Sequence, residues 1–387
     1  QLNNAPALYD VPVASLQFDV SLAAGEAYTQ RFIFGAARDT DEIQQLRRQH
    51  LSKSGFNQAL QKTASYLNQV EPAVHIQTED TAFDQFINLW LPRQVFYHGD
   101  VDRLTTDPQT RNYLQDGMGM IFLDSAKARE KIIRTLSQQH QDGSLPDGIL
   151  LNEAAELKYI NTVPHSDHCV WLPICLHTYI CETGDVSILD IPIPFADNST
   201  PTRVFEHLEL AMQWLKNNMD ERGLSLIHQG DWCDPMNMVG HQGKGVSAWL
   251  SMATSYAWQR WADICDAIMQ QSHANRWNHH ADVLNKNISQ FFWHDKWFAR
   301  GITDAGRSFG IKQDQQGSIY LNPQSWAMLA GVVDTYEADA LIAEVEQHLG
   351  TPYGLEMLGP PYTEMVEDIG RLTQKFPGTA ENGSVYN

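Results

Sequence analysis

Cysteine is scarce in this chain, with five among 387 residues: Cys169, Cys175, Cys181, Cys233 and Cys265. The number is odd and no two cysteines form a CxxC pair, so the sequence shows neither a small disulfide framework nor a cysteine-based metal motif. Three of them lie six apart in an apolar helical stretch, which is typical of core thiols. The pattern fits a reducing compartment, and we expect a cytoplasmic protein.

Positive charge is also scarce: 27 lysine and arginine residues face 47 aspartates and glutamates, for a net charge of −20. This balance argues against nucleic acid or an anionic membrane as the main partner. No apolar run is long enough to span a bilayer, and no signal peptide is visible. Because the chain begins at Gln1 rather than Met and stops abruptly at Asn387, we expect a fragment that is truncated at its C-terminus.

Strand patterns are confined to the beginning of the chain. The segments 14–20 and 28–35 alternate apolar and polar residues, which is typical of half-buried strands. Two strands alone do not make a stable sheet, so we predict that residues 1–39 are the tail of a β-sandwich domain. Residues 40–75 are polar and begin with N-cap chemistry at Asp39, and they predict a helical linker.

Residues 76–387 show no alternation of strands with helices and no short repeat. Apolar residues recur there every three or four positions, and the chain's hydrophobic content of 43 % is enough for a sizeable core. We predict a mainly α fold in which helix pairs form an α/α toroid, with the site in the loops at one end. The predicted helices span 81–98, 112–124, 125–140, 167–183, 202–219, 245–270, 274–294, 323–333 and 336–349.

One loop combines two carboxylates with an aromatic ring. The segment 228–245, HQGDWCDPMNMVGHQGKG, places Asp231 and Asp234 on either side of Trp232. Cleavage of a glycosidic bond needs an acid at the leaving oxygen and a surface for the sugar ring, which an aspartate and a tryptophan supply. The alternative is a helix N-cap, since an isolated DWxD motif is more often structural.

A second segment, TRNYLQD at 110–116, carries Arg111 and Asp116 where a loop meets a helix. Such a charged pair could hold sugar hydroxyls in a bidentate manner, although a capping salt bridge is the simpler interpretation. A third segment, HSDHCVWLP, offers His165, Asp167 and His168. For Asp167 an N-cap role is favoured, a sugar contact comes next, and a metal site comes last because the spacing is not HExxH.

The chain ends with a glycine-rich turn, PGTAENGSVYN, that carries Glu381; the alternative is a plain surface loop. Tryptophan is frequent, with 11 residues, and Trp232 is the one that we place against a sugar. Six others lie on helical stretches and are predicted to be core: Trp171, Trp214, Trp249, Trp258, Trp261 and Trp326.

Together and in this order, these segments resemble glycoside hydrolase family 94, the cellobiose and chitobiose phosphorylases and the related cyclic glucan enzymes. TRNYLQDGMGM resembles the donor-site motif, HSDHCVWLP with ETGDVSILD the next helix pair, and GDWCDPMNMVGHQGKG the acid loop. IYLNPQSWAMLAG and TPYGLEMLGPPYT resemble late barrel segments, and KFPGTAENGSVYN resembles the acceptor-site turn. The resemblance extends through nearly the whole chain.

The resemblance implies an (α/α)6 barrel preceded by a helical linker and the remnant of an N-terminal β-sandwich. It implies that Asp234 is the proton donor, that Trp232 lines the cleavage site, and that Glu381 contacts the acceptor sugar. Arg111 and Asp116 would hold the donor glucose. We also expect Asp231 and Asp167 to contact the substrate. The family needs no metal and no cofactor, uses inorganic phosphate as co-substrate and commonly forms dimers, so we expect a homodimer.

The chain departs from the family pattern at two places. Asn112 stands where family members often have Asp after Arg. The family's phosphate-binding histidine and Thr-Gly pair, which follow the ENG turn, would lie beyond Asn387, and the first part of the sandwich is absent. We therefore expect the phosphate site to be incomplete in this sequence, and phosphate to need a local basic pocket within a strongly acidic chain.

The implied reaction is phosphorolysis of a β-linked glucosyl disaccharide with inversion, giving α-glucose 1-phosphate. Asp234 must carry a proton near neutral pH, so we expect its pKa to be raised by burial or by Asp231. The string 156–165 and the chain's ending are most similar to family members that act on cellobionic acid and release gluconate. The aldonate carboxylate would need a cation, for which Lys158, Arg371 and Lys375 are candidates.

Other functions remain open. The acid loop also fits a cellobiose phosphorylase or a module that processes cyclic β-1,2-glucan. An inverting hydrolase on the same barrel would need a second carboxylate, about 6.5–9.5 Å from Asp234, to activate water. A non-catalytic sugar-binding domain would keep its ligand affinity when Asp234 is replaced by Asn.

Overall fold

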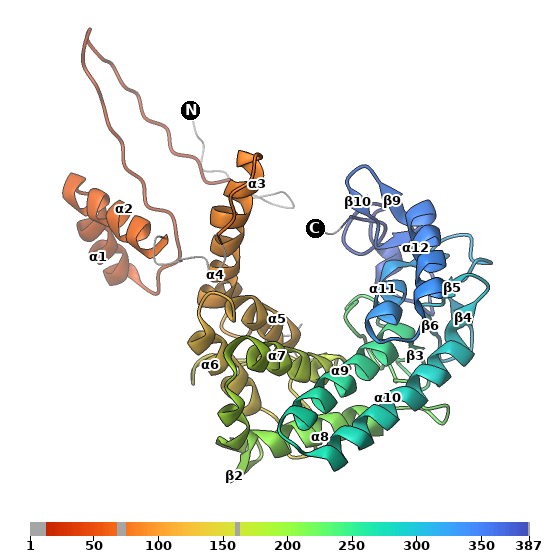
Figure 1. Ribbon diagram of the computed structural model, residues 1–387. Coiled ribbons are helices and arrows are strands. Elements are labelled where there is room, and N and C mark those ends of the chain that lie inside the picture. Colours follow the sequence, from red (N-terminus) through yellow and green to blue (C-terminus); the bar gives the residue numbers. More distant parts are fainter. Residues whose placement is uncertain (1–12, 68–74, 159–162, 386–387) are drawn as a thin grey trace. The chain divides into compact units, whose positions relative to one another are not determined.

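The computed structural model describes residues 13–67, 75–158 and 163–385 of the chain (Figure 1). The chain divides into two compact units, Gln1–Val70 and Glu71–Asn387. Each unit is considered by itself below.

The described beginning of the first unit, residues 13–38, is extended with a single turn and contains no strand. The prediction of two β-strands there is wrong, because a strand requires a neighbour that completes its backbone hydrogen bonds, and no described residue forms a ladder with these segments. Apolar side chains such as Phe18 and Phe34 are consequently exposed. The alternating pattern identified an apolar face of this segment, but it did not identify any other part of the chain that would pack against that face. The assignment of residues 1–39 to a β-sandwich stays a prediction.

Two helices occupy the predicted linker: α1 (Thr40–His50) and α2 (Lys53–Leu67). Asp39 caps the first of them, since its side chain accepts a hydrogen bond of 2.8 Å from the backbone N–H of Glu42. The predicted N-cap is therefore confirmed.

The second unit is mainly helical, and a helix occurs in each range that the sequence predicted. Its first helical stretch is continuous, because a π-helical turn, η1 (Phe86–Trp90), joins α3 (Thr81–Gln85) to α4 (Leu91–Val101). The later helices are α5 (Thr110–Met120), α6 (Ser125–Leu136), α7 (His168–Thr183), α8 (Val204–Asn217), α9 (Ala248–Ala267), α10 (Gln271–Phe292), α11 (Leu321–Leu329) and α12 (Thr335–Leu349). Among the described residues, 3-10 turns lie at η2 (Asp102–Leu104), η4 (Val186–Asp190) and η5 (Arg371–Gln374).

The helices of this unit pack in two rows. Helices α5, α7, α9 and α11 contact one another in succession, while α6, α8, α10 and α12 each pack against the helix that precedes them (Figure 1). Helices α7 and α9 are buried along most of their length, as expected for segments that are apolar on several sides. The loops before these two buried helices carry two of the segments that the sequence singled out for chemistry, those of His165 and of Asp234.

Short strands join the loops between helices. Strand β3 pairs with β6, which pairs with β7, and Ser247 on β3 lies opposite Gly301 on β6. This sheet anchors the end of the 228–245 loop at the start of α9. The strands are β1 (Pro192–Phe195), β2 (Asn198–Arg203), β3 (Val246–Ser247), β4 (Trp293–His294), β5 (Trp297–Phe298), β6 (Gly301–Ile302), β7 (Ser308–Phe309), β8 (Ile319–Tyr320), β9 (Gly350–Thr351), β10 (Gly354–Leu355) and β11 (Leu358–Gly359).

Tryptophans form much of the core, as predicted. Trp249, Trp258 and Trp261 are no more than 2 % exposed, and Trp171 is 6 % exposed. The remaining two predicted core tryptophans, Trp214 and Trp326, are half-buried and pack against the same core.

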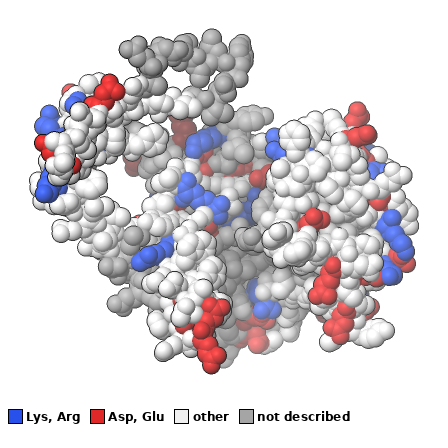
Figure 2. All heavy atoms as spheres, turned by 90° about the horizontal axis from the view of Figure 1, so that it is seen from above, with Lys and Arg blue, Asp and Glu red and all other residues white. Residues whose placement is uncertain are grey.

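No helix among the described residues has the length and apolarity needed to cross a membrane. On the face shown in Figure 2, acidic and basic side chains are interspersed among uncharged ones. The negative net charge is therefore not gathered into one patch on that face.

Candidate active site

The 228–245 loop, called the acid loop below, is anchored by Asp231, whose side chain is fully buried. Both of its oxygens accept hydrogen bonds from Arg300 Nη2, at 2.7 and 2.8 Å. Ser247 Oγ donates to Asp231 Oδ2 at 2.6 Å, and the backbone N–H of Cys233 donates to Oδ1 at 2.9 Å. The carboxylate is therefore committed to protein groups that position the loop, and its expected contact with substrate stays a prediction.

Arg300 is a site residue that the sequence reasoning missed. Its side chain is 2 % exposed, and it also donates to Ser247 Oγ at 2.9 Å. Burial lowers the pKa of its guanidinium, but the Asp231 carboxylate raises this pKa by more than burial lowers it. The pKa therefore lies above its ordinary value and the pair is ionic. Because 69 residues separate Arg300 from Asp231, no local pattern signals the contact.

Asp234, three residues further along the loop, has a different environment. Its side chain remains 33 % exposed, and its Oδ1 accepts a hydrogen bond of 2.8 Å from Arg111 Nη2. Gln109 Nε2 donates to the same oxygen at 3.4 Å, and His165 Nε2 also lies 3.4 Å from it. The predicted acid is thus accessible, in contact with the predicted arginine, and surrounded by nitrogen groups.

Arg111 lies in the first turn of α5 and is held by two carboxylates. Its Nη1 donates to both oxygens of Asp167 at 2.9 and 3.1 Å, while its Nη2 binds Asp234. Burial lowers the pKa of Arg111, and Asp167 and Asp234 raise it more strongly, so its pKa is raised overall. The site therefore holds a buried permanent cation within a chain of net charge −20.

Asp167 occupies the N-cap position of α7, as predicted, but its side chain makes no capping hydrogen bond. It accepts instead from Arg111 and, at 3.0 Å, from Trp171 Nε1, one turn along the helix. Arg111 lowers the pKa of this fully buried carboxyl against the effect of burial, which raises it. The N-cap position of Asp167 is thus confirmed, but its side chain binds the buried guanidinium, which is a stronger partner than backbone N–H groups. A contact between Asp167 and the sugar stays a prediction.

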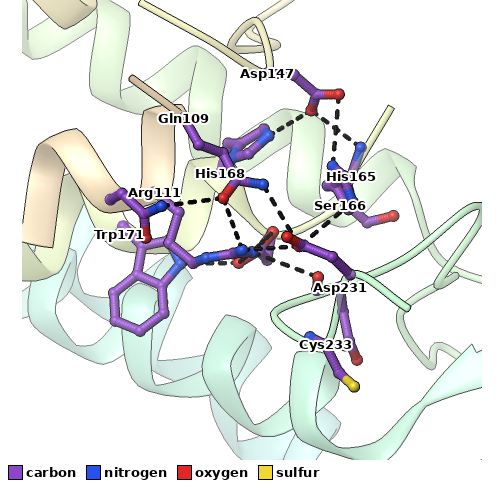
Figure 3. Close-up of polar contacts among 12 residues, drawn as sticks. Gln109, Arg111, Asp147, His165, Ser166, His168, Trp171, Asp231 and Cys233 are labelled. Carbon is purple, nitrogen blue, oxygen red and sulfur yellow. Dashed lines mark hydrogen bonds and ion pairs between the residues drawn. The ribbon is translucent and has the colours of Figure 1, made fainter. Parts of the chain in front are cut away.

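A buried trio lies behind the acid: Asp147, His165 and His168 (Figure 3). His168 Nε2 is 2.5 Å from Asp147 Oδ1, and His165 Nδ1 is 3.5 Å from Asp147 Oδ2. Burial raises the pKa of Asp147, but its contacts with both histidines bring it down to about 2. The trio's ligand atoms are close enough to hold a metal ion, yet the short His168–Asp147 hydrogen bond uses the atoms that a metal would need. We interpret the trio as a carboxylate–histidine group in which the His168 ring is hydrogen-bonded to Asp147 and the His165 ring lies at ion-pair distance from it. Asp147, which the sequence reasoning missed, replaces Asp167 in it.

Arg111 and Asp116 do not pair with each other, so the capping salt bridge between them is not formed. Asp116 accepts hydrogen bonds of 2.7 and 2.8 Å from Arg103 Nε and Nη2 and lies 3.8 Å from His98 Nδ1. A separation of five residues turns the two side chains to different faces of α5. The predicted contact of Asp116 with the donor glucose stays a prediction.

The C-terminal turn meets the acid loop. Glu381 and Trp232 line the same small cavity. The turn that carries Glu381 is locked by Asn382, which is fully buried and hydrogen-bonds through its side chain to the backbone of Tyr362 and to Lys375 O. The interpretation as a plain surface loop is therefore wrong, because a buried amide with three backbone partners defines the turn's conformation.

The three candidate cations differ in how they are engaged. Lys158 Nζ lies 2.8 Å from Asp107 Oδ1 and donates to Thr105 Oγ1 at 2.6 Å. Arg371 and Lys375 are exposed and lie four residues apart in the segment that precedes the Glu381 turn. Lys158 is thus neutralised locally, whereas the other two precede the turn in the chain.

Comparison with known proteins gives a consistent result. A model of the Glycosyl hydrolase 94 superfamily, catalytic domain, matches residues 66–387. The chain is 50 % identical over 386 residues to a cellobionic acid phosphorylase of Neurospora crassa, covering 100 % of this chain and 49 % of that protein. It is 32 % identical over 375 residues to a 3-O-β-D-glucopyranosyl-β-D-glucuronide phosphorylase of Paenibacillus borealis, covering 97 % and 48 %. A solabiose phosphorylase of the same organism is 30 % identical over 387 residues, covering 99 % and 49 %. The chain spans about half the length of these curated relatives.

Proposed function

The chain belongs to the glycosyl hydrolase 94 superfamily, and from this we propose that it is the catalytic part of an inverting disaccharide phosphorylase with Asp234 as the acid. The observation that carries the proposal is the arrangement at the acid loop. Asp234 is accessible and lies 2.8 Å from the buried cation Arg111, whereas its neighbour Asp231 is committed to Arg300. The two aspartates of one loop thus take separate roles, one chemical and one structural.

In the proposed reaction, Asp234 gives its proton to the glycosidic oxygen as the bond between that oxygen and the anomeric carbon breaks. A phosphate oxygen forms a new bond to the anomeric carbon from the opposite face, which inverts the configuration and gives α-glucose 1-phosphate. Phosphate is already an anion, so it needs positive charge and hydrogen-bond donors rather than a base. Arg111 is bonded to both Asp234 and Asp167, so in this scheme it orients the acid and does not bind the phosphate on the opposite face.

Three buried carboxylates near Asp234 are not available as the base of a hydrolysis reaction. An inverting hydrolase needs a second carboxylate that is free to activate water. Asp231 and Asp167 are each 0 % exposed and bonded to arginine, and Asp147 is bonded to histidine. These three groups are all engaged, so none of them is placed as a water-activating base.

We propose cellobionic acid as the disaccharide, which would give gluconate as the second product. The 50 % identity to a cellobionic acid phosphorylase supports this choice. For the aldonate carboxylate, Arg371 and Lys375 are better candidates than Lys158, because the lysine at 158 already pairs with Asp107. Cellobiose is the alternative substrate.

Release of glucose 1-phosphate from cellobionic acid, cellobiose and chitobiose by the full-length protein, with and without phosphate, tests this function. We expect release that depends on phosphate and is fastest with cellobionic acid. Equal rates on cellobionic acid and cellobiose would contradict the aldonate proposal. Glucose release without phosphate would instead indicate a hydrolase.

We further propose that the two helical rows of the second unit are part of an (α/α)6 barrel and that the enzyme is a cytoplasmic homodimer. The succession of contacts α5, α7, α9 and α11, each with an outer partner, supports the barrel. Sedimentation of the full-length protein at several concentrations tests the dimer, and a monomer at all concentrations would contradict it.

A further inference from the structure

The acid is paired with a cation in this structure, although its proposed role requires a proton. The Arg111 guanidinium lies 2.8 Å from Asp234 Oδ1, and this oxygen accepts a hydrogen bond from it. A guanidinium keeps its protons, so Arg111 is not a source of the proton that Asp234 delivers. A nearby group with a proton to give is needed.

His165 is in the right place to hold that proton. Its ring lies between two carboxylates, with Nε2 3.4 Å from Asp234 Oδ1 and Nδ1 3.5 Å from Asp147 Oδ2 (Figure 3). Its side chain is only 2 % exposed, and neither ring nitrogen has a hydrogen-bond partner of normal geometry among the described residues. A buried imidazole that faces an anion through each nitrogen is stabilised as the doubly protonated cation.

The surrounding charges favour the same state. Asp147, Asp167 and Asp234 act on His165 from three segments, while Arg111 from α5 opposes them. Burial lowers the pKa of His165, but its interactions with Asp147 and the other carboxylates raise it above its ordinary value overall. His168 shares Asp147 with His165, and no contact is found between His168 and Asp234 in the described structure.

The backbone holds the ring in this position. The His165 N–H donates to Asp147 Oδ1 at 3.0 Å, and Ser166 N–H donates to Gly230 O at 3.0 Å. A Cβ added at Gly230 would lie 2.9 Å from His165 Cδ2, so the acid loop packs closely against the imidazole. Only a residue without a side chain allows this approach, and Gly230 has φ +154°.

We propose that His165 stores the catalytic proton at rest and passes it from Nε2 to Asp234 Oδ1 when substrate is bound. This inference rests on the proposed function of Asp234. In the transfer, the N–H bond at Nε2 breaks and an O–H bond forms at Oδ1, which leaves a neutral imidazole and a neutral carboxylic acid. Asp234 then gives the proton to the leaving oxygen and returns to the carboxylate.

The proton balance closes over one turnover. Hydrogen phosphate loses one proton to water as it becomes the phosphate ester, and His165 takes up one proton from water. The ring lines a pocket together with His228 and His241, which gives it a route to solvent. Asp147 remains ionised throughout and holds the ring in orientation, as the carboxylate partner of a catalytic histidine does.

A kinetic test compares His165→Gln with His279→Gln, the same substitution at an exposed histidine of α10. For His165→Gln we expect the kcat of phosphorolysis to fall by about 100-fold, the usual scale for a lost proton-transfer group, with KM values for both substrates within about threefold. The alkaline limb of its kcat profile should move at least one pH unit lower. The His279→Gln enzyme should keep the kcat and the pH profile of the unmodified enzyme.

A spectroscopic test needs no turnover and no His165 variant. In NMR spectra of the unmodified protein labelled with ¹⁵N-histidine, one buried histidine ring should carry protons on both nitrogens at pH 7. In Asp234→Asn the same ring should lose its second proton at a lower pH. A single-proton ring at pH 7 would overturn the proposal, as would an unchanged kcat and pH profile in His165→Gln. An Asp234→Asn enzyme that keeps full activity would instead overturn the proposed function itself.

Discussion

At the scale of single residues, the site depends on how each carboxylate is paired. Asp231 and Asp234 are three residues apart, yet the first is fully buried in an ion pair with Arg300, whereas the second is partly exposed and pairs with Arg111. Burial makes an ion pair sensitive to the loss of one partner, because the remaining charge then lies unpaired in a medium that solvates it poorly. The two aspartates should therefore respond to mutation in different ways.

Replacing Arg300 by Met tests the structural half of this pair. We expect Arg300→Met to lower the free energy of unfolding by about 3–5 kcal/mol, since it leaves the Asp231 carboxylate buried and unpaired. Chemical denaturation measures the loss, with the exposed Arg371→Met as control, for which a change within about 0.5 kcal/mol is expected. Adding Asp231→Asn to Arg300→Met should recover part of the stability. No recovery would show that the charge of Asp231 is not what destabilises the variant.

Binding of the aldonate carboxylate is also assigned to single residues. Arg371→Met should raise the KM for cellobionic acid about fivefold, since an exposed ion pair contributes up to about 1 kcal/mol, and leave the KM for cellobiose unchanged. Lys158→Met should affect neither KM, because Asp107 already neutralises that ammonium group. A rise in both KM values for Arg371→Met would point to a structural effect, and a selective rise in Lys158→Met would reverse the assignment.

At the scale of elements, the acid loop is positioned by what lies behind it. Gly230 packs against the His165 ring, and Asp304 holds the loop's other end by accepting hydrogen bonds from the backbone N–H groups of residues 242, 244 and 245. The loop is thus fastened near both of its ends. Asp234 lies between these two points of attachment.

Gly230→Ala should lower kcat by at least tenfold while the protein stays folded, because the new Cβ displaces His165 and shifts the acid loop. The matched control is Gly243→Ala in the same loop, where φ is +79° but no atom lies within 4 Å of the added Cβ. It imposes backbone strain of about 1 kcal/mol without moving the histidine. Equal kcat losses in the two variants would show that strain, not the contact with His165, is responsible.

At the scale of the whole molecule, the helical content and the order of the helices followed from apolar spacing alone. Each predicted helix is present, since a period of three to four residues marks the face that a helix buries. The same reasoning failed for residues 13–38, where alternation was present but no pairing partner was among the described residues. Strands depend on a neighbour distant in sequence, which local patterns do not specify.

The candidate site was predictable only in part for a similar reason. Asp234, Arg111 and Asp167 stood out through their motifs, and the structure brings them together. Arg300 and Asp147 were missed because they act through residues far along the chain and lie in unremarkable local sequence. Which charge pairs with which, as for Asp116 with Arg103, is decided by packing and not by spacing.

Acid stability of the whole fold should depend on Asp147. Its pKa of about 2 in the folded protein lies below the ordinary 3.8, so its ionisation stabilises the fold above pH 3.8 and this stabilisation is lost as the pH falls towards 2. The shift corresponds to about 2 kcal/mol. Asp147→Asn should flatten the fall in unfolding free energy between pH 4 and pH 2, measured by urea titration. An unchanged slope in this range would contradict the shift.

The most direct measurement of the central claim is the rate at which Asp234→Asn releases glucose 1-phosphate from cellobionic acid, compared with the unmodified full-length protein at saturating phosphate. An amide of the same shape cannot donate the proton to the leaving oxygen. We therefore predict a kcat at least 100-fold lower, with an unchanged melting temperature and retained affinity for the disaccharide. A kcat within threefold of the unmodified enzyme would show that the leaving oxygen receives its proton from another group.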